Sequence, residues 1–378
     1  MNTASYNFDK KFLRQNDSNI IELSVGQSAI LVSPRYQAKV FTSTMAGDSG
    51  KSIGWINYEA FSSATDPHMN AYGGENRFWL GPEGGPFSLF FKPGVEMEFK
   101  NWRTPAPIDT EPWRLVKKDA QSATMNKEMR LLNYAGYTMS MSVMRTVAIQ
   151  KKEEIEKTLN IDLHDSIQFV GYTTNNILKN TGDTAWNDTT GMPCIWILDM
   201  FNPSPATVVI IPFKKPATQQ KVATTNYFGE IERNRLRITD SVIYFLADGR
   251  KRGKMGVLPQ FVLPIAGSYD AVNNILTIVE FDTDSSGKYL NQVWNTTNEV
   301  FSGDAMNAYN DGPLEDDTQM GPFYEIESVS PAAGLNPGQF IVHNHSVYHF
   351  TGPKKHLDKI VKSTLGIDLR TISQAFRR

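Results

Sequence analysis

The chain has 378 residues, of which 40% are hydrophobic and 21% charged, with a formal net charge of −2. This composition is typical of a folded protein and excludes extensive disorder. The near-neutral charge gives no electrostatic case for binding nucleic acid. One cysteine, Cys194, excludes an internal disulfide framework, and its apolar neighbours predict a buried, unreactive thiol.

The sequence also bears on membranes and compartment. No run approaches the roughly eighteen apolar residues that a membrane-spanning helix needs. Residues 1–20 lack the apolar stretch behind a basic start that marks a secretory signal. We therefore expect a cytoplasmic protein, or a periplasmic one if an export signal has been trimmed from the sequence.

Runs that alternate or are rich in β-branched residues predict strands along the whole chain. They lie at 20–25, 29–33, 37–42, 87–91, 139–144, 144–149, 167–173, 207–211 and 276–281. The 27 glycines and 20 prolines separate these runs, as all-β folds require. The sequence therefore predicts an all-β protein, with one large domain over residues 1–378.

Two helices are predicted. A short one lies within 56–64, and the other is the C-terminal tail at about 355–378, where apolar residues recur at helical spacing. A charge cluster at 150–157 is expected to be the exposed end of a hairpin, because strands are predicted around it.

The segment 72–85 combines five glycines, two carboxylates, three aromatic residues and the pair Asn76-Arg77. Glycines let a backbone approach a ligand closely, Asn and Arg supply fixed donors, and Trp79 supplies a flat apolar face. A sugar requires this mixture, because its ring alternates C–H patches with hydroxyls. We expect Glu75, Asn76, Arg77 and Trp79 to contact a sugar. The alternative is a glycine-rich connection between strands, with Arg77 in a surface ion pair.

The segment 307–313 is predicted to be a loop, since Asn, Asp, Gly and Pro dominate it. Loops on rigid β scaffolds often carry binding residues. Tyr309 could stack against a sugar ring and Asp311 could accept its hydroxyls. The alternative is a turn in which Asp311 caps its own backbone.

Glu325 and Glu327 are two residues apart on a predicted strand, so both point to one face. A carboxyl group held near apolar surface has a raised pKa and suits proton transfer. Paired carboxyl groups would also suit glycoside hydrolysis, in which their separation decides the mechanism. The alternative places both side chains on the solvent face of an edge strand.

Three histidines share one parity on the last predicted strand. His343 and His345, with Glu325 or Glu327, form a candidate transition-metal site. His349 lies about 20 Å from His343 along an extended strand, so all three cannot bind one ion. Hydrogen-bonded or exposed histidines are the alternative, and we expect no metal or other cofactor.

These segments, in this order, resemble the aldose 1-epimerase (galactose mutarotase) superfamily. That superfamily has an Asn-Arg pair in an early glycine-rich segment, matched by Asn76-Arg77. It also has a late Glu-x-Gln strand followed by Pro and a Leu-x-Pro-Gly turn, matched by 325–327, Pro331 and 335–338. Over nearly its full length the chain looks like an uncharacterised bacterial family related to those epimerases.

The resemblance implies a β-supersandwich of large antiparallel sheets with a C-terminal helix and a sugar cleft on a concave face. It implies that Glu325 is the base, that Glu327 replaces a family glutamine, and that Asn76 and Arg77 hold sugar hydroxyls without a cofactor. The family's catalytic histidine, which protonates the ring oxygen, has no counterpart here. Asp199 falls closest to its position and would need a strongly raised pKa to act as the acid.

We therefore expect a carbohydrate-active protein that binds a mono- or oligosaccharide, with acid/base chemistry altered from that of an epimerase. The alternative is a non-catalytic carbohydrate-binding module. A structural or partner-binding β protein is a third class, which predicts that Arg77 and Glu325 do not converge. A separation above about 15 Å would exclude both sugar hypotheses, since a monosaccharide in a pocket could not contact both side chains.

Overall fold

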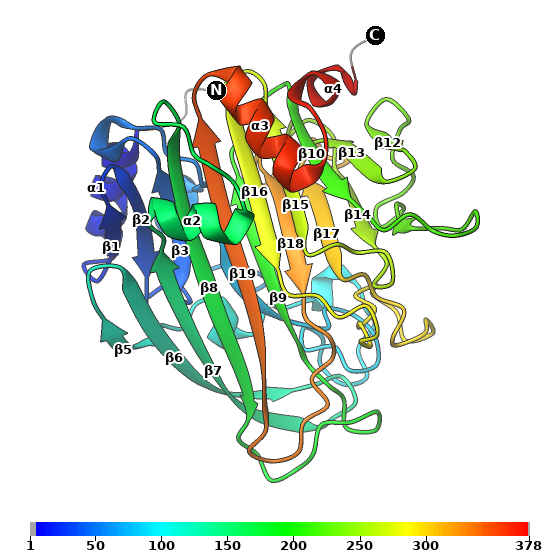
Figure 1. Ribbon diagram of the computed structural model, residues 1–378. Helices are drawn as coiled ribbons and strands as arrows, with labels where there is room; N and C mark the ends of the chain where they lie inside the picture. Colours follow the sequence, from blue (N-terminus) through cyan, green and yellow to red (C-terminus); the bar gives the residue numbers. More distant parts are fainter. Residues whose placement is uncertain (1–4, 377–378) are drawn as a thin grey trace.

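The structure, a computed structural model, describes residues 5–376. Its strands form three antiparallel sheets of ten, six and three strands. The ten-stranded sheet runs across the view in Figure 1, from β5 at the left to β12 at the right. No helix within residues 5–376 is long and apolar enough to cross a membrane.

The last strand in sequence, β19, lies near the middle of the ten-stranded sheet. β19 pairs with β16 on one side and with β8 on the other. In spatial order the strands are β12 (Leu236–Ile238), β13 (Val242–Leu246), β10 (Thr207–Pro212), β15 (Ile265–Asp270), β16 (Ile275–Phe281), β19 (Phe340–Thr351), β8 (Gln168–Asn180), β7 (Thr138–Ile149), β6 (Ser122–Leu132) and β5 (Arg114–Lys118).

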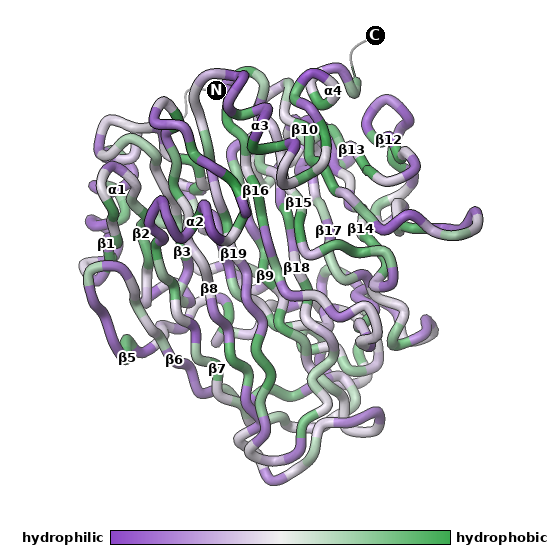
Figure 2. Tube along the Cα trace, viewed as in Figure 1, coloured by the Kyte–Doolittle hydropathy of each residue, from purple (hydrophilic) through white to green (hydrophobic). Residues whose placement is uncertain are grey.

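The six-stranded sheet is covered on both faces, because β9 and β18 are buried at every residue. In spatial order its strands are β11 (Ala223–Thr224), β14 (Gly253–Val257), β17 (Met306–Asn310), β18 (Tyr324–Val329), β9 (Cys194–Phe201) and β4 (Arg77–Gly81). The three-stranded sheet consists of β1 (Ile21–Val25), β2 (Ser28–Ser33) and β3 (Lys39–Thr44). Figure 2 shows hydrophobic residues concentrated along the central strands and hydrophilic ones in the loops and helices.

Within residues 5–376, four α-helices and four short 3-10 helices complete the fold. The α-helices are α1 (Tyr6–Asn16), α2 (Lys152–Leu159), α3 (Lys354–Leu365) and α4 (Leu369–Gln374). The 3-10 helices span Gly47–Ser49, Tyr58–Phe61, Phe99–Asn101 and Ala106–Ile108. α3 and α4 bury Leu357, Ile360 and Ile372 against the large sheet, in the cluster that contains Ile278 and Tyr348. Figure 1 shows α2 and α3 on the same side of that sheet.

Several sequence expectations need correction. The charge cluster at 150–157 starts α2, because the Glu154 side chain accepts from the Lys151 backbone N–H at 2.7 Å and Ile155 is fully buried. α1 was not predicted. The segment 87–91 forms no strand, since Phe90 and Phe91 pack as loop residues in the core.

Three other expectations hold in part. The predicted loop at 307–313 forms most of β17 before it turns. The predicted C-terminal tail is two helices, which part at Gly366 in a left-handed conformation, and its residues 377–378 lie outside the described part. Residues 58–61 form a 3-10 helix inside the predicted 56–64 segment.

Alternation along β18 divides the six-stranded sheet into two chemically distinct faces. Ser328 contacts His343 and His345 of β19, and the Tyr324 hydroxyl lies 2.8 Å from Ser268 Oγ of β15. Tyr324, Ile326 and Ser328 therefore point toward the large sheet. We call this side the inner face and the opposite side, onto which Glu325 and Glu327 project, the outer face.

Candidate functional site

The outer face brings together two residues that lie far apart in sequence. Arg77 Nη2 donates to Glu325 Oε1 at 2.7 Å, and both side chains are less than a tenth exposed. Arg77 leaves the sheet at the start of β4, whereas Glu325 lies on β18 two strands away, across β9. This contact excludes the large separation that a purely structural β protein predicted for the pair.

The second carboxyl group of the strand is held by a lysine and a tryptophan. Glu327 Oε2 accepts from Lys254 Nζ at 2.8 Å and from Trp196 Nε1 at 2.9 Å. Lys254 Nζ also lies 4.8 Å from the centre of a Trp196 ring, and Arg77 lies 5.0 Å from a Trp79 ring. We call Arg77, Lys254, Glu325 and Glu327, with these two tryptophans, the outer-face cluster.

Burial changes the protonation of this cluster. It raises the pKa of Glu325 to about 8; the charge of Glu327 raises it further and Arg77 opposes the shift. Burial also raises the pKa of Glu83, which follows β4, to about 7, although the charge of Lys254 lowers it. Glu325 therefore holds a proton near neutral pH, which is what a general acid requires.

Two buried atoms of the cluster have no hydrogen-bond partner among residues 5–376. They are Glu327 Oε1 and Arg77 Nε, an acceptor and a donor. Buried polar atoms are rarely left unpaired in folded proteins. A ligand that offers both a hydroxyl hydrogen and an oxygen would satisfy both, and a sugar offers both.

Solvent comes nearest to the cluster along β14 and β17. Tyr309, paired with Glu325 in the sheet, is half-buried, and its hydroxyl donates to Asp311 Oδ1 at 3.1 Å. Phe228, which is 47% exposed, packs edge-on against Tyr309 and carries Arg252 over its ring. Asp311 also accepts from the Gly321 backbone N–H at 2.8 Å, so it fixes the loop before β18.

The inner face carries Asp199, which therefore lies on the opposite side of the sheet from Glu325. Asp199 Oδ2 accepts from His345 Nε2 at 2.8 Å, and His345 Nδ1 lies 2.8 Å from Ser328 Oγ. Ser328 Oγ is also 2.8 Å from His343 Nε2, and burial lowers the pKa of His343 to about 3. Asp199 and Glu325 cannot act on the same atoms of one ligand from these positions.

Asn76 is also turned away from Glu325, because adjacent residues of a strand face opposite sides. Asn76 Nδ2 donates to Asp199 Oδ1 at 2.6 Å, and Asn76 Oδ1 accepts from the buried Arg145. Arg145 donates to Asn176 Oδ1 at 2.7 Å and to the Ala38 carbonyl at 3.0 Å. We call Asn76, Arg145, Asp199, Ser328, His343 and His345 the inter-sheet network. Of the expected Asn-Arg pair, only Arg77 reaches the outer face.

Glu75 has a further inward contact. His349 Nε2 lies 3.1 Å from Glu75 Oε1, and Thr277 Oγ1 lies 2.9 Å from His349 Nδ1. As alternation predicted, His343, His345 and His349 share one side of β19. Within the described residues no group of three His, Cys, Asp or Glu side chains is arranged to hold a metal. His343 and His345 are instead hydrogen-bonded through Ser328, and Glu325 and Glu327 lie on the other face.

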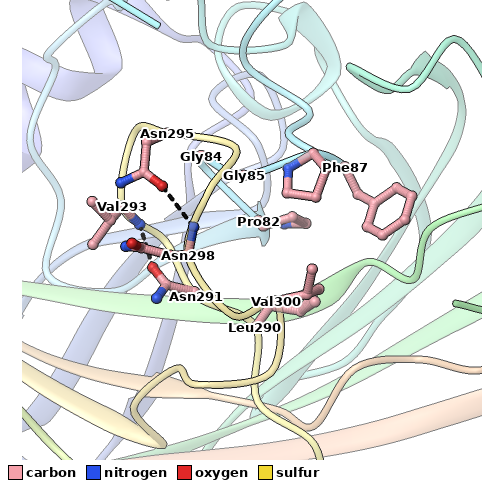
Figure 3. A pocket seen from close by; sticks show the side chains of 11 residues that line it. Pro82, Gly84, Gly85, Phe87, Leu290, Asn291, Val293, Asn295, Asn298 and Val300 are labelled. Carbon is pink, nitrogen blue, oxygen red and sulfur yellow. Dashed lines mark hydrogen bonds between the residues drawn. The ribbon is translucent and has the colours of Figure 1, made fainter.

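The glycines at the end of the 72–85 segment allow two loops to pack closely against each other. A small cavity of about 10 Å³ lies there, between residues 82–87 and 290–300 (Figure 3). This is about the space one water molecule requires, so the cavity cannot hold a sugar. A Cβ on Gly84 would lie 2.2 Å from the Val293 carbonyl oxygen, so only glycine lets the two backbones approach.

Sequence reasoning missed Lys254 and Trp196 as parts of this site. Lys254 lies in a short strand between Gly253 and Met255, where a charged residue amid buried neighbours is a weak signal of a buried ion pair. Its partner is 73 residues away, so no local pattern identifies it. Cys194 is fully buried, as predicted, and burial raises its pKa to about 12.

Comparison with known proteins identifies the fold. The model of a family of unknown function (DUF6786) matches residues 4–376, and no curated protein matches the sequence. An Escherichia coli K12 protein, provisionally described as an aldose 1-epimerase, is similar with a TM-score of 0.53 and 13% identity, over 88% of this chain and 98% of that one. The Slr1438 protein from Synechocystis sp. PCC 6803 gives 0.51 and 12%, over 88% and 96%.

A galactose mutarotase-like protein from Lactobacillus casei ATCC 334 has a TM-score of 0.48 at 9% identity, over 88% of this chain and 100% of that one. The two matches with TM-scores of 0.53 and 0.51 identify the fold, and at their identities they leave function open. The all-β, galactose mutarotase-like supersandwich of large antiparallel sheets, implied by the sequence resemblance, is confirmed.

Proposed function

We propose, for a chain that belongs to the family of unknown function DUF6786 and has a galactose mutarotase-like fold, a carbohydrate-active function at the outer-face cluster. The contact of 2.7 Å between Arg77 and Glu325 is the observation that carries this proposal. A guanidinium and a carboxyl group beside Trp79 and Trp196 are suited to sugar hydroxyls and C–H faces. The ligand is a mono- or oligosaccharide.

The chemistry that this cluster supports is the opening of a cyclic hemiacetal by one acid and one base. Glu325, whose pKa burial raises to about 8, donates its proton to the ring oxygen. Glu327, through its free Oε1, takes the proton of the anomeric hydroxyl. Two carboxyl groups in different environments can divide these roles. No histidine is needed, and Glu325 acts as the acid rather than as the base that the resemblance implied.

A second candidate function is carbohydrate binding without turnover. The low exposure of the cluster favours it, since Glu325 is 6% exposed and Glu327 is fully buried. A sugar that reaches Glu327 must first displace protein atoms that cover it. A ligand held only at Tyr309, Arg77 and Glu325 would leave Glu327 unused.

The deciding experiment is NMR exchange between the anomers of a panel of aldoses, with wild-type protein and with Glu325→Gln. We expect protein-dependent exchange that falls by about 10² or more in Glu325→Gln, the usual effect of losing a general acid. Glu280→Gln is the matched control. Burial also raises the pKa of Glu280, to about 7, but Glu280 lies on the large sheet beside Tyr348.

The outcomes separate the two functions. Exchange that is equal in Glu325→Gln and in wild type would contradict the acid role of Glu325. No exchange with any aldose would end the mutarotase proposal. Quenching or enhancement of tryptophan fluorescence by the same sugars, lost in Arg77→Gln, would then support binding without turnover.

A further inference from the structure

A second reactive group lies beside the outer-face cluster. Lys39, the first residue of β3, is only 2% exposed. Its ammonium nitrogen lies 5.3 Å from the centre of the Phe41 ring and 5.8 Å from that of the Tyr72 ring. Within residues 5–376 no carboxylate lies within 4.0 Å of Lys39 Nζ, and the nitrogen makes no hydrogen bond. A buried lysine without a partner is costly to keep charged.

The backbone around Lys39 is built to place this side chain. Gln37 and Ala38, the two residues before it, have φ values of +62° and +54°, a left-handed conformation that non-glycine residues rarely adopt. The Ala38 carbonyl is held there by Arg145 Nε at 3.0 Å. Strain of this kind is kept where the surrounding structure requires it, and functional sites are where it concentrates.

The lysine stem passes over the glycine-rich segment. A Cβ on Gly74 would lie 2.2 Å from Lys39 Cδ and 2.6 Å from Lys39 Cγ. Gly74 has a φ of +119°, so any other residue there would be strained as well as obstructed. The absence of a side chain at Gly74 therefore leaves the space that the Lys39 side chain occupies.

Burial and the charge of Arg77 both disfavour the charged form of the Lys39 amine. Burial lowers the pKa of Lys39 well below its usual range, and the positive charge of Arg77 lowers it further, against the opposing charge of Asp109. Asp109 is itself occupied, since it accepts from Asn70 Nδ2 at 2.8 Å and from the Asn70 backbone N–H. A neutral lysine amine is a nucleophile toward carbonyl carbon.

We propose that Lys39 forms an imine with the open-chain aldehyde of a reducing sugar, an inference that rests on the proposed function. The amine nitrogen attacks the aldehyde carbon, and the resulting carbinolamine loses its oxygen as water. Both amine protons leave in that water, so the step needs no oxidant or reductant and is reversed by hydrolysis. The half-buried Tyr72, whose ring centre lies 5.8 Å from Lys39 Nζ, is the partly exposed neighbour past which the aldehyde would approach.

The test is reductive trapping at pH 7 with two probes, glycolaldehyde and D-glucose, each followed by borohydride and peptide mass mapping. We expect Lys39 to be labelled at least tenfold faster than Lys117, an exposed lysine of β5. An exposed lysine is neutral in roughly one molecule in 10³ at pH 7. Labelling of Lys39 should rise less steeply between pH 6 and 9 than the labelling of an ordinary exposed lysine, which rises about tenfold per pH unit.

Each outcome bears on the proposal. Lys39→Met should abolish the fast labelling and Lys117→Met should leave it unchanged; if Lys39→Met does not fold, the pH profile of the wild type decides. Labelling of Lys39 no faster than that of Lys117 overturns the imine. Labelling by glycolaldehyde but not by D-glucose overturns its assignment to sugars. Labelling by both probes, with no effect of Glu325→Gln on anomer exchange, supports the imine and contradicts the proposed acid.

Discussion

The two faces of the six-stranded sheet carry similar buried polar side chains. The faces differ in whether the polar atoms of those side chains have hydrogen-bond partners. On the inner face, Asp199 receives hydrogen bonds from His345 and from Asn76, which in turn accepts from Arg145. None of the buried side-chain polar atoms of the inter-sheet network lacks a partner, although Glu75 Oε2, which also lies on the inner side, has none among the described residues. On the outer face, Glu327 Oε1 and Arg77 Nε have none among the described residues.

This difference teaches how to separate structural from functional polar groups in one protein. A complete buried network fixes the packing of two sheets, and each bond lost from it is expensive. An incomplete network leaves buried donors and acceptors unpaired, and a ligand can pair with them. The comparison therefore predicts that inner-face substitutions reduce stability, whereas outer-face substitutions reduce ligand binding and chemistry more than stability.

The largest effect is expected for Arg145→Met, which keeps an unbranched side chain at the buried position but removes the guanidinium donors. The Ala38 carbonyl and the amide oxygens of Asn76 and Asn176 would lose their bonds to the guanidinium. Breaking such a network costs about 3 to 5 kcal/mol. Urea unfolding measures this, and a loss below about 1 kcal/mol would contradict the structural role of the inner face.

Lys254→Met comes next, with an expected loss of about 3 kcal/mol. The substitution leaves the fully buried Glu327 without its cation. Lys254→Met combined with Glu327→Gln should recover part of the loss, because no buried charge then remains. If the double variant is as unstable as Lys254→Met alone, packing of the lysine stem against Trp196 matters more than the charge.

The pH dependence of stability should show the raised pKa of Glu325. An unfolded glutamate titrates near pH 4.5 and the folded Glu325 at about 8, so the native state holds a proton that the unfolded chain has lost between these values. Stability from this group is therefore greatest below pH 4.5 and falls as pH rises to 8, by at most about 1.4 kcal/mol per pH unit.

The control for this slope is Glu325→Gln, which cannot titrate. Unfolding curves at pH 5, 6.5 and 8 should show a smaller decline in the variant than in the wild type. Glu83, with its pKa raised to about 7, contributes a remaining slope of the same sign. Parallel curves for wild type and variant would show that Glu325 is ionised throughout.

The smallest effect on stability is expected for Tyr309→Phe, about 0.5 to 1 kcal/mol, because its single hydrogen bond to Asp311 is partly solvated. Sugar binding by fluorescence should weaken more than stability does, since the half-buried Tyr309 lies where solvent approaches the outer-face cluster. A change in stability without a change in affinity would place the ligand elsewhere.

The sequence predicted those parts of the fold whose pattern of residues lies within a single segment. Alternation located the segments that became β1, β2, β7, β10 and β16, because each strand carries its own pattern. The charges of 150–157 hid α2, whose buried side consists of Ile155 and Leu159. The composition of 307–313 suggested a loop, although pairing with β14 and β18 makes residues 306–310 a strand.

The candidate site was predictable only in part for the same reason. Sequence identified Arg77, Glu325 and Glu327, and alternation correctly gave the two glutamates one face. It could not show that Asp199 faces the other side, because that depends on the register of β9 against β18. Lys39 acquires its character from burial and Lys254 from a partner distant in sequence, and no local pattern signals either.

The position of β19 has a consequence for how the protein is made. The strand separates β8 from β16 in the finished sheet, yet it is synthesised after every other strand. While the ribosome has not yet released residues 340–351, the large sheet exists as two halves that each expose an unpaired strand edge. Such edges attract other chains. A chain truncated before residue 340 should therefore aggregate rather than fold.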